Sequence, residues 1–492
     1  MESTNLNMFP RPRGLALFKI LIASLTLIIL LTQIGKKTTH KSTKAKPINI
    51  QGILRTKNGN IVDEQGKNVS ICWNVTRNGK FIQQNDTQFA PRLVSRISNA
   101  TKPWLYLYSG YYDDRETVKN GSVVRVTGMI QRNRIKDIKD KYYCYLWYPS
   151  SSYPVTVKAK GRILWTYDAP FMSAIFTCPV PSSHKNLPTD VTISDEKCQN
   201  ITNMISIRPE LISKKTGNVG ICCKVIYGSP DPVRIVEWVE LNLLIGAEHI
   251  YMYNSSLKGK VNTVLDYYQE LGVMTVYKHD FPNKMNKEAL RKPFPFQGFL
   301  ANYNGYNQNW ELEVMSLTDC PYVAKERFLV TVDIDEILWP NKHGNYKDLT
   351  EHLHNQTKPR GAASYTFWTG NFVDEFKADT KPFYPKYLHM LRYNKRTKID
   401  WESPKSIIDS KYAVGTGHHV ALMKTQDAIQ KFEISDGKVG YNRHYREHCR
   451  LVGAPNKCKN LMANPQNDTT LDKFKDKLVE RVFPVLKQFH LL

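Results

Sequence analysis

Several common sequence signals are missing from this chain of 492 residues. Its nine cysteines form no Cys-x-x-Cys pair, which argues against a structural zinc site. No Gly-x-Gly-x-x-Gly motif occurs, so the usual fingerprint of dinucleotide binding is absent. Acidic residues are few, 45 against 69 lysines and arginines. The resulting net charge of +24, taken alone, favours nucleic acid, a membrane surface or an anionic substrate as partner.

One long hydrophobic run is present at residues 15–34, and it has the length of a membrane-spanning helix. It lies far from any small-residue cleavage site, which argues against a removed signal peptide. We expect residues 1–14 to form a cytosolic tail, residues 15–34 a transmembrane signal-anchor and residues 35–50 a polar stem. Slightly more positive residues follow the run than precede it, but long following domains are translocated largely regardless of such charge.

Glycosylation sequons indicate the orientation of the chain. The nine Asn-x-Ser/Thr sites all follow the hydrophobic run: Asn68, Asn74, Asn85, Asn99, Asn120, Asn200, Asn254, Asn355 and Asn467. All nine cysteines also follow it, as expected of a chain in an oxidising compartment, and their odd number leaves at least one without an intrachain partner. The sequence therefore predicts a single-pass type II membrane protein with a lumenal body, and it argues against nucleic-acid binding.

The body of the chain changes its pattern near residue 216. Residues 51–215 consist of short β-prone runs broken by Asn, Gly and Pro, which predict a β-rich domain resembling a small sandwich. Residues 216–492 alternate strands with helical patterns at 234–245, 260–272 and 309–327. The fold class predicted for this second domain is α/β, with a mostly parallel, nucleotide-binding sheet.

Three carboxylates follow a buried strand in the segment VTVDIDEILWP, which spans residues 330–340. They are Asp333, Asp335 and Glu336, and carboxylates so close together repel one another unless a cation or water compensates. The carboxyl end of a strand in an open α/β sheet is also where ligands bind. A divalent metal that holds a phosphorylated substrate would meet both conditions, while a solvated acidic turn is the alternative.

The second domain resembles glycosyltransferase family 92 in the order and spacing of several segments. These are EWVELNLLIGAEHIYMYNSS, LTDCPY, FLVTVDIDEILWP and HYREHC, within roughly residues 220–458. The resemblance implies a GT-A-like fold with a DxD metal site. It also implies a Golgi enzyme that moves a hexose, typically galactose from UDP-galactose, onto a glycan of a glycoprotein or glycolipid, with inversion.

A sugar-nucleotide donor leaves a diphosphate whose charge must be neutralised, and Mn²⁺ or Mg²⁺ serves this purpose in such sites. The resemblance implies Asp335 as a direct metal ligand and Asp333 as a ligand through water or a contact to the donor ribose. It further implies Glu336 as a supporting residue and His444 as the histidine that completes the site.

Lys405 and Arg446 are candidate contacts to the diphosphate, because each supplies a positive charge near these segments. Each could also be an ordinary solvated charge. An inverting enzyme further needs a carboxylate that takes the proton from the acceptor hydroxyl. Asp374 and Glu375 are our candidates, since they follow the aromatic segment that begins at Trp368.

Glu433 and Asp436 are rival candidates for this base, and any of the four could instead be a surface carboxylate. Two other functions stay open. One is a catalytically inactive lumenal glycan-binding protein. The other is a phosphohydrolase with an aspartate nucleophile, which is disfavoured because that class has Thr where this chain has Ile337.

Overall fold

The computed structural model describes residues 55–57, 60–62, 70–76, 90–92, 104–149, 151–165, 169–182, 186–199, 201, 203–208, 212–280, 306–381, 384–449 and 455–492. The predicted cytosolic tail, transmembrane anchor and stem lie outside these segments. Within them, no helix combines the length and the apolar character that crossing a membrane requires. Residues 50–492 form one compact unit.

The first half of this unit is built from strands, as the short β-prone runs predict. They are β1 (Arg55–Lys57), β2 (Asn60–Val62), β3 (Ser70–Ile71), β4 (Ala90–Arg92), β5 (Leu105–Asp113), β6 (Val123–Gln131), β7 (Tyr143–Trp147), β8 (Val155–Lys158), β9 (Lys160–Ile163), β10 (Phe171–Pro179), β11 (Asp190–Ser194) and β12 (Ile205–Arg208). Two short 3-10 helices accompany them, η2 (Arg132–Asp137) and η3 (Ile212–Lys214).

Strand β12 connects two groups of strands into one ten-stranded sheet. It pairs antiparallel with β11 and parallel with β5, within the order β3-β8-β7-β11-β12-β5-β6-β10-β9, and the tenth strand, β4, pairs with β5. The disulfide between Cys144 and Cys178 joins β7 to β10, which are not neighbours in this order. Leu107, Leu146 and Phe176 share one buried apolar cluster with these strands. The sheet therefore folds over and packs against itself, as the two layers of a sandwich do.

The second half mixes strands and helices. In chain order they are β13 (Gly217–Tyr227), α2 (Pro232–Leu244), β14 (His249–Ser255), α3 (Lys260–Glu270), β15 (Met274–Lys278), α5 (Tyr306–Val323), β16 (Glu326–Val332), β17 (Glu336–Trp339), α6 (Tyr346–Thr357), β18 (Ser364–Val373), η4 (Asp374–Phe376), α7 (His389–Arg392), β19 (Lys395–Arg396), β20 (Asp400–Asp409), β21 (Ala413–Thr416), β22 (Ala421–Lys424), β23 (Phe432–Ile434), β24 (Tyr441–Arg446), α8 (Pro455–Met462), β25 (Gln466–Asn467), η5 (Asp472–Phe474) and α9 (Lys475–Gln488).

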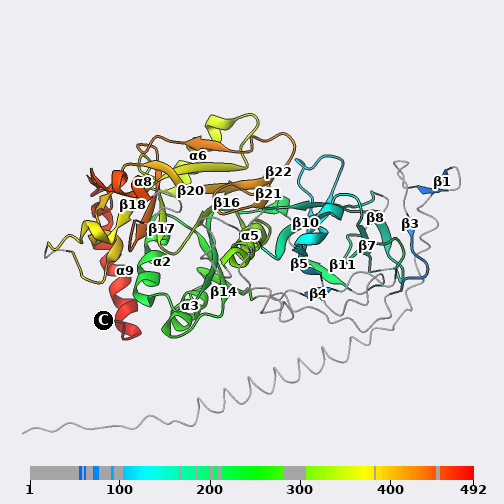
Figure 1. Ribbon diagram of the computed structural model, residues 1–492, viewed down its shortest axis with the longest axis horizontal. Coiled ribbons are helices and arrows are strands. Elements are labelled where there is room, and N and C mark those ends of the chain that lie inside the picture. Colours follow the sequence, from blue (N-terminus) through cyan, green and yellow to red (C-terminus); the bar gives the residue numbers. More distant parts are fainter. Residues whose placement is uncertain are drawn as a thin grey trace, which may run out of the picture. The chain divides into compact units, whose positions relative to one another are not determined.

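The main sheet of this half has nine strands in the order β15-β14-β13-β16-β20-β18-β24-β17, with β23 beside β18. Figure 1 labels β14, β16, β17, β18 and β20 of this sheet. Five of its pairings are parallel and three are antiparallel, so the sheet is mostly parallel as predicted. The carboxyl ends of β13, β14 and β16 meet at one edge because these strands are parallel neighbours. The segment with the three carboxylates follows β16 at this edge.

Local sequence explains helix α2 well. Asp231 precedes it and accepts a hydrogen bond from the backbone N–H of Val233 at 2.9 Å, while Pro232 occupies the first helical position. Gly246 follows its end with φ +104°, a conformation that favours glycine. The helix predicted at 309–327 is shorter at its end, because residues from Glu326 onward pair with β13 and β20 as strand β16.

Helix α5 packs against both halves of the unit, between β10 and β13 (Figure 1). Its buried Glu311 accepts a hydrogen bond from the backbone N–H of Ser173 in β10 at 2.7 Å. Arg115 from the β-rich half donates to the carbonyls of Ser410 and Ala413, both at 2.6 Å. These buried polar contacts, and not only apolar packing, join the two halves.

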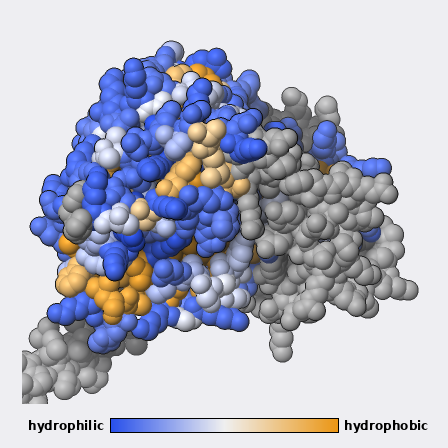
Figure 2. Space-filling model, turned by 60° about the vertical axis from the view of Figure 1, so that its left-hand side comes forward, coloured by the Kyte–Doolittle hydropathy of each residue, from blue (hydrophilic) through white to orange (hydrophobic). Residues whose placement is uncertain are grey.

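The surface drawn in Figure 2 is mostly hydrophilic, and hydrophobic residues gather there in separate small patches.

Most cysteines of the described residues are buried in the protein interior. Cys222 of β13 is bonded to Cys320 of α5, whereas its neighbour Cys223 is a buried free thiol. The two adjacent cysteines therefore have different fates, as expected for side chains on opposite faces of a strand. Cys72 and Cys198 form a further disulfide, and Cys449 is also disulfide-bonded.

Candidate functional site

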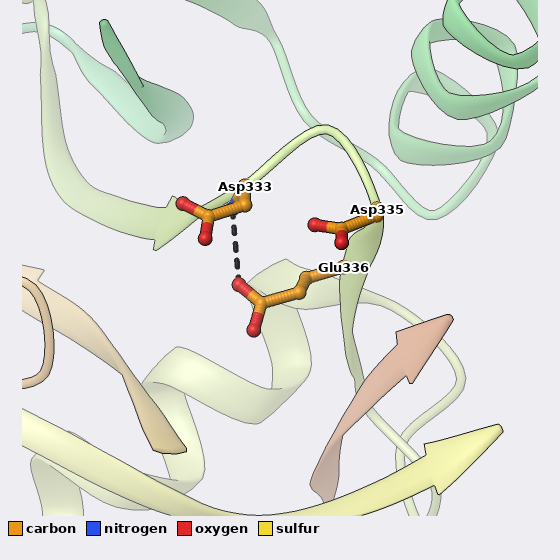
Figure 3. A group of neighbouring side chains, drawn as sticks. All are labelled: Asp333, Asp335 and Glu336. Atoms are coloured by element: carbon orange, nitrogen blue, oxygen red, sulfur yellow. Dashed lines mark hydrogen bonds between the residues drawn. The ribbon is translucent and has the colours of Figure 1, made fainter. Parts of the chain in front are cut away.

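The three carboxylates surround the tight turn between β16 and β17 (Figure 3). The backbone N–H of Glu336 donates to the carbonyl of Asp333 at 3.1 Å, and the backbone N–H of Asp333 donates to Glu336 Oε2 at 3.0 Å. Carboxylate oxygens from Asp333, Asp335 and Glu336 lie within 4.8 Å of one another. The turn therefore gathers three acidic groups at the ligand-binding edge of the sheet.

Two lysines, the buried Lys405 and the partly exposed Lys224, compensate the repulsion that the sequence predicts between these groups. Lys224 from β13 and Lys405 from β20 both place Nζ 3.2 Å from Asp333 Oδ2. Lys405 also lies 2.8 Å from Glu336 Oε2, and Lys224 lies 3.2 Å from Glu313 of α5. Lysines from β13 and β20, the two strands that flank β16, thus hold the acidic turn through ion pairs.

Charge pairing sets the protonation of this network. Burial alone would raise the pKa of Asp333, but Lys224 and Lys405 outweigh it and hold that pKa well below its usual range. Burial likewise opposes the charge on Lys405, yet Asp333 and Glu336 raise its pKa above the ordinary value. Asp333 is therefore ionised, and its charge is already balanced within the protein.

Asp335 differs from its neighbours because its side chain is 43% exposed. Its Oδ2 lies 3.3 Å from His444 Nε2, on strand β24. The other ring nitrogen of His444 lies 3.1 Å from Glu336 Oε1, and Asn442 donates to the same oxygen at 3.2 Å. His444 thus lies between Asp335 and Glu336, and its buried Nδ1 makes no hydrogen bond to the described residues.

This donor set fits a divalent cation. Asp335 supplies an exposed carboxylate oxygen and His444 a buried ring nitrogen 3.3 Å away, while Asp333 is held by lysines. Mn²⁺ accepts mixed oxygen and imidazole ligands, and it keeps positions for phosphate oxygens. The residues present would therefore hold the metal mainly through Asp335 and His444. The ligand roles predicted from the sequence stay predictions.

A cavity of about 490 Å³ opens beside this turn. Its lining includes Arg234 and Glu237 of α2, Ile334 and Asp335 of the turn, and His389 of α7. Glu237 is buried and accepts hydrogen bonds from the backbone N–H groups of His389 at 2.8 Å and of Met390 at 2.9 Å. Burial raises the pKa of Glu237 to about 8, although these N–H donors favour its ionised form.

The carboxylates predicted as catalytic bases occupy different surroundings. Asp374 follows β18 and lies 3.1 Å from His389 Nε2 and 3.8 Å from Arg234, so it contacts two residues that line the cavity. Glu375 instead accepts from the backbone N–H of Cys449 at 3.0 Å, away from the lining residues. The structure therefore brings Asp374, but not Glu375, into contact with the cavity wall.

The remaining predicted residues are more scattered. Arg446 ends β24, two positions after His444, and it is not among the described residues that contact the three carboxylates. Glu433 accepts from Trp368 Nε1 at 2.8 Å on strand β23. Asp436 caps a local turn by accepting from the backbone N–H of Lys438. The roles predicted for these residues stay predictions.

Comparison with known proteins agrees with the geometry. The family model of glycosyltransferase family 92 matches residues 217–483, just over half of the chain. The chain belongs to glycosyltransferase family 92. No curated protein matches the sequence. Among solved structures, one titled "Crystal structure of S. aureus TarS 1-349" is 9% identical, with 55% of this chain and 72% of that chain covered and a TM-score of 0.24.

Membership in this family identifies the protein as a glycosyltransferase, with a sugar-nucleotide donor and a glycan acceptor as the implied substrates. The matched residues include the whole acidic turn, both compensating lysines and His444. They exclude the β-rich half, which nonetheless contacts helix α5. The candidate site thus lies entirely within the matched region.

Proposed function

We propose that this protein is a metal-dependent glycosyltransferase that moves galactose from UDP-galactose onto a glycan in the secretory pathway. One observation carries the proposal: Asp335 is exposed beside the buried ring of His444, at a turn whose other carboxylates are already paired with lysines. Beside them lies a cavity of about 490 Å³, large enough for part of a nucleotide sugar. A GT-A-like arrangement agrees with the sheet order and with the turn after its fourth parallel strand.

The chain's own residues divide the work of donor binding. Asp335 and His444 would hold a divalent cation, which supplies Lewis-acid stabilisation to the departing diphosphate. Lys224 and Lys405 fix Asp333 and thereby the shape of the turn, so that Asp335 does not reorient as charge develops. Arg234 lines the same cavity and carries a positive charge where phosphate oxygens would lie.

The proton of the acceptor hydroxyl needs a base on the opposite side of the transferred sugar, if the reaction inverts. We assign this role to Asp374, because His389 and Arg234 orient it toward the cavity lining. His389 is held in turn by Glu237 through its backbone N–H. Glu375 has no comparable contact to the cavity and is the weaker candidate.

We further propose that the enzyme is a Golgi type II membrane protein whose residues 35–492 are lumenal. The support is the hydrophobic run at 15–34 together with nine sequons and nine cysteines that all follow it. The disulfides within the described chain agree with an oxidising compartment. Glycosidase treatment of the full-length protein should lower its apparent mass by several glycans, and an unchanged mass would reverse the orientation.

The test of activity uses the full-length protein with a panel of UDP-sugars, Mn²⁺ and a mixture of released glycans. We expect UDP release to be fastest from UDP-galactose, to stop with a chelator and to return when Mn²⁺ is restored. Asp335→Asn serves as the inactive control. If the folded protein turns over no UDP-sugar with Mn²⁺ or with Mg²⁺, the proposal is wrong. The protein would then be an inactive glycan-binding protein.

A further inference from the structure

An exposed aromatic cluster lies on the strands that flank the candidate site. Trp401 is 38% exposed at the start of β20, and its ring meets that of Trp368 from β18 edge-on, with centroids 6.3 Å apart. Lys431 Nζ lies 4.3 Å from the centroid of the Trp401 ring. Glu433 accepts from Trp368 Nε1 at 2.8 Å and lies 3.1 Å from Lys431. We call these four residues the aromatic platform.

The contacts of the platform hold its rings in place; Lys431 lies over the ring of Trp401, and 38% of Trp401 stays exposed. Glu433 uses one oxygen for Trp368 and the other for Lys431, and Lys431 in turn reaches the ring of Trp401. Exposed ion pairs of this kind add little to stability, so stability is a weak reason for fixing an exposed tryptophan. An exposed rigid ring flanked by one carboxylate and one ammonium has the components of a ligand site.

Sheet topology places the platform at the same edge as the acidic turn. Strand β20 runs antiparallel to β16, with Ser406 opposite Thr331, so the residues before Ser406 extend past the carboxyl end of β16. Trp401 is four residues from Lys405, which contacts Asp333. The register of β20 on β18 shifts here: Lys405 lies opposite Phe367 and Asp400 opposite Thr369, so this segment advances by only about two residues, roughly 7 Å, along the sheet. An oligosaccharide extending from the cavity could span it.

We infer that the aromatic platform binds a neutral pyranose of the glycan acceptor. This inference rests on the proposed function, since it assigns one part of the acceptor to these residues. The apolar C–H face of a pyranose packs against an indole ring and removes both surfaces from water. Glu433 and Lys431 would meet its hydroxyls. Because these two side chains cancel each other's charge, the platform favours a neutral sugar over an acidic one.

The experiment measures direct binding without donor or catalysis. Labelled N-glycans released from a serum glycoprotein, with and without enzymatic desialylation, are titrated with full-length protein by fluorescence anisotropy. The wild type should bind the desialylated glycans, and Trp401→Ala should weaken that binding at least tenfold. Trp401→Phe keeps an aromatic face and should retain most of the affinity. Trp165→Ala is the matched control, because Trp165 is equally exposed at 38% but lies outside the platform.

Thermal unfolding with Mn²⁺ and UDP separates this inference from the proposed function. Trp401→Ala should keep the full stabilisation by Mn²⁺ and UDP, which shows that it is folded and that its donor site is intact. The inference fails if the wild type binds no desialylated glycan, if Trp401→Ala binds as well as the wild type, or if Trp165→Ala loses as much. Absence of the Mn²⁺ and UDP stabilisation in the wild type would instead count against the proposed donor site.

Discussion

The ammonium of Lys405 lies 3.2 Å from the carboxylate of Asp333, and this pair connects strand β20 to the turn after β16. Lys224 approaches the same oxygen of Asp333 from β13 at an equal distance. Asp333 therefore bridges cations from the two strands that flank β16. Asp333 therefore mainly holds the turn in place, whereas the more exposed Asp335 is the residue proposed to bind the metal.

Asp333→Asn should destabilise the protein, because it leaves Lys224 and Lys405 without their shared partner. Breaking a buried ion pair by removing one side costs about 3 kcal/mol, and the side chain of Asp333 is only 19% exposed. We expect a lower midpoint in thermal or urea unfolding without metal. Asp335→Asn is the control and should unfold like the wild type. Equal midpoints for all three proteins would show that the lysines do not depend on Asp333.

Asp335→Asn should remove metal binding while the fold persists. Mn²⁺ stabilises a folded protein that binds it, and UDP should increase the effect if both share the site. The variant should lose this stabilisation and at least a hundredfold of its turnover, since the leaving diphosphate loses electrostatic stabilisation. Differential scanning fluorimetry with and without Mn²⁺ measures the first effect. A variant with undiminished metal response would place the metal elsewhere.

Acidification should destabilise the protein through buried histidines. Burial lowers the pKa of His279 and of His419 to about 4, against about 6.5 in an unfolded chain. Between these values the unfolded chain binds protons that the folded protein does not. The stability from this effect is complete above about pH 6.5 and is lost as the pH falls toward 4, on the order of 1.4 kcal/mol per pH unit for each proton.

The melting temperature should therefore fall between pH 7 and pH 5. His279→Gln removes one of these groups, so its melting temperature should depend less on pH over this range. A melting temperature that stays constant or rises on acidification would contradict the assignment of neutral buried histidines. The hydrogen bond between His279 Nε2 and the carbonyl of Leu312, at 3.1 Å, would also be tested by this variant.

The disulfide between Cys222 and Cys320 should stabilise the second half of the molecule. It joins β13 to α5 across 98 residues of sequence, and native disulfides of this kind contribute about 2–5 kcal/mol. The double variant Cys222→Ala with Cys320→Ala should lose stability within that range by urea unfolding. Cys223→Ala is the matched control, because it removes only a buried free thiol. If Cys223→Ala unfolds at as low a urea concentration as the double variant, the loss of stability comes from altered packing and not from the missing disulfide.

Asn254 should carry no glycan, although it begins a sequon. Its side-chain amide donates to Asn262 Oδ1 at 3.2 Å and accepts from the backbone N–H of Leu257 at 3.0 Å. Asn120 is exposed in a turn and should be occupied if the chain is lumenal. Peptide mapping by mass spectrometry would compare the two sites. A largely occupied Asn254 would require that the end of β14 opens before the chain has folded.

The sequence predicts the elements around the site better than the site itself. Alternating strand and helix patterns locate β13, α2, β14 and α3, because apolar periodicity and turn residues are local properties. The acidic turn is also evident, since three carboxylates follow a buried strand. Lys224 is the compensating cation that the sequence reasoning missed, although a lone lysine in the buried run ICCKVIYG is an available indication.

Other site residues leave no local trace in the sequence. Glu237 appears as one more polar position of helix α2, yet it is buried and holds the backbone at His389. His389 itself comes from the four-residue helix α7, more than 50 residues after the acidic turn, and no recognisable motif marks it in the sequence. Contacts between such distant segments depend on how the sheet brings them together, and a single sequence does not contain that information.

The buried hydrogen bonds that join the two halves make the stability of the second half depend on the β-rich half. Glu311 accepts a hydrogen bond from the backbone N–H of Ser173, and Arg115 donates to the carbonyls of Ser410 and Ala413. A shortened transcript that encoded only the family-matched region would leave Glu311 without this partner and would uncover the apolar face around α5. Such a product would also lack residues 15–34, and it should misfold and be degraded. Natural variation in the upstream half is therefore expected to lower the amount of enzyme even where it leaves the catalytic residues untouched.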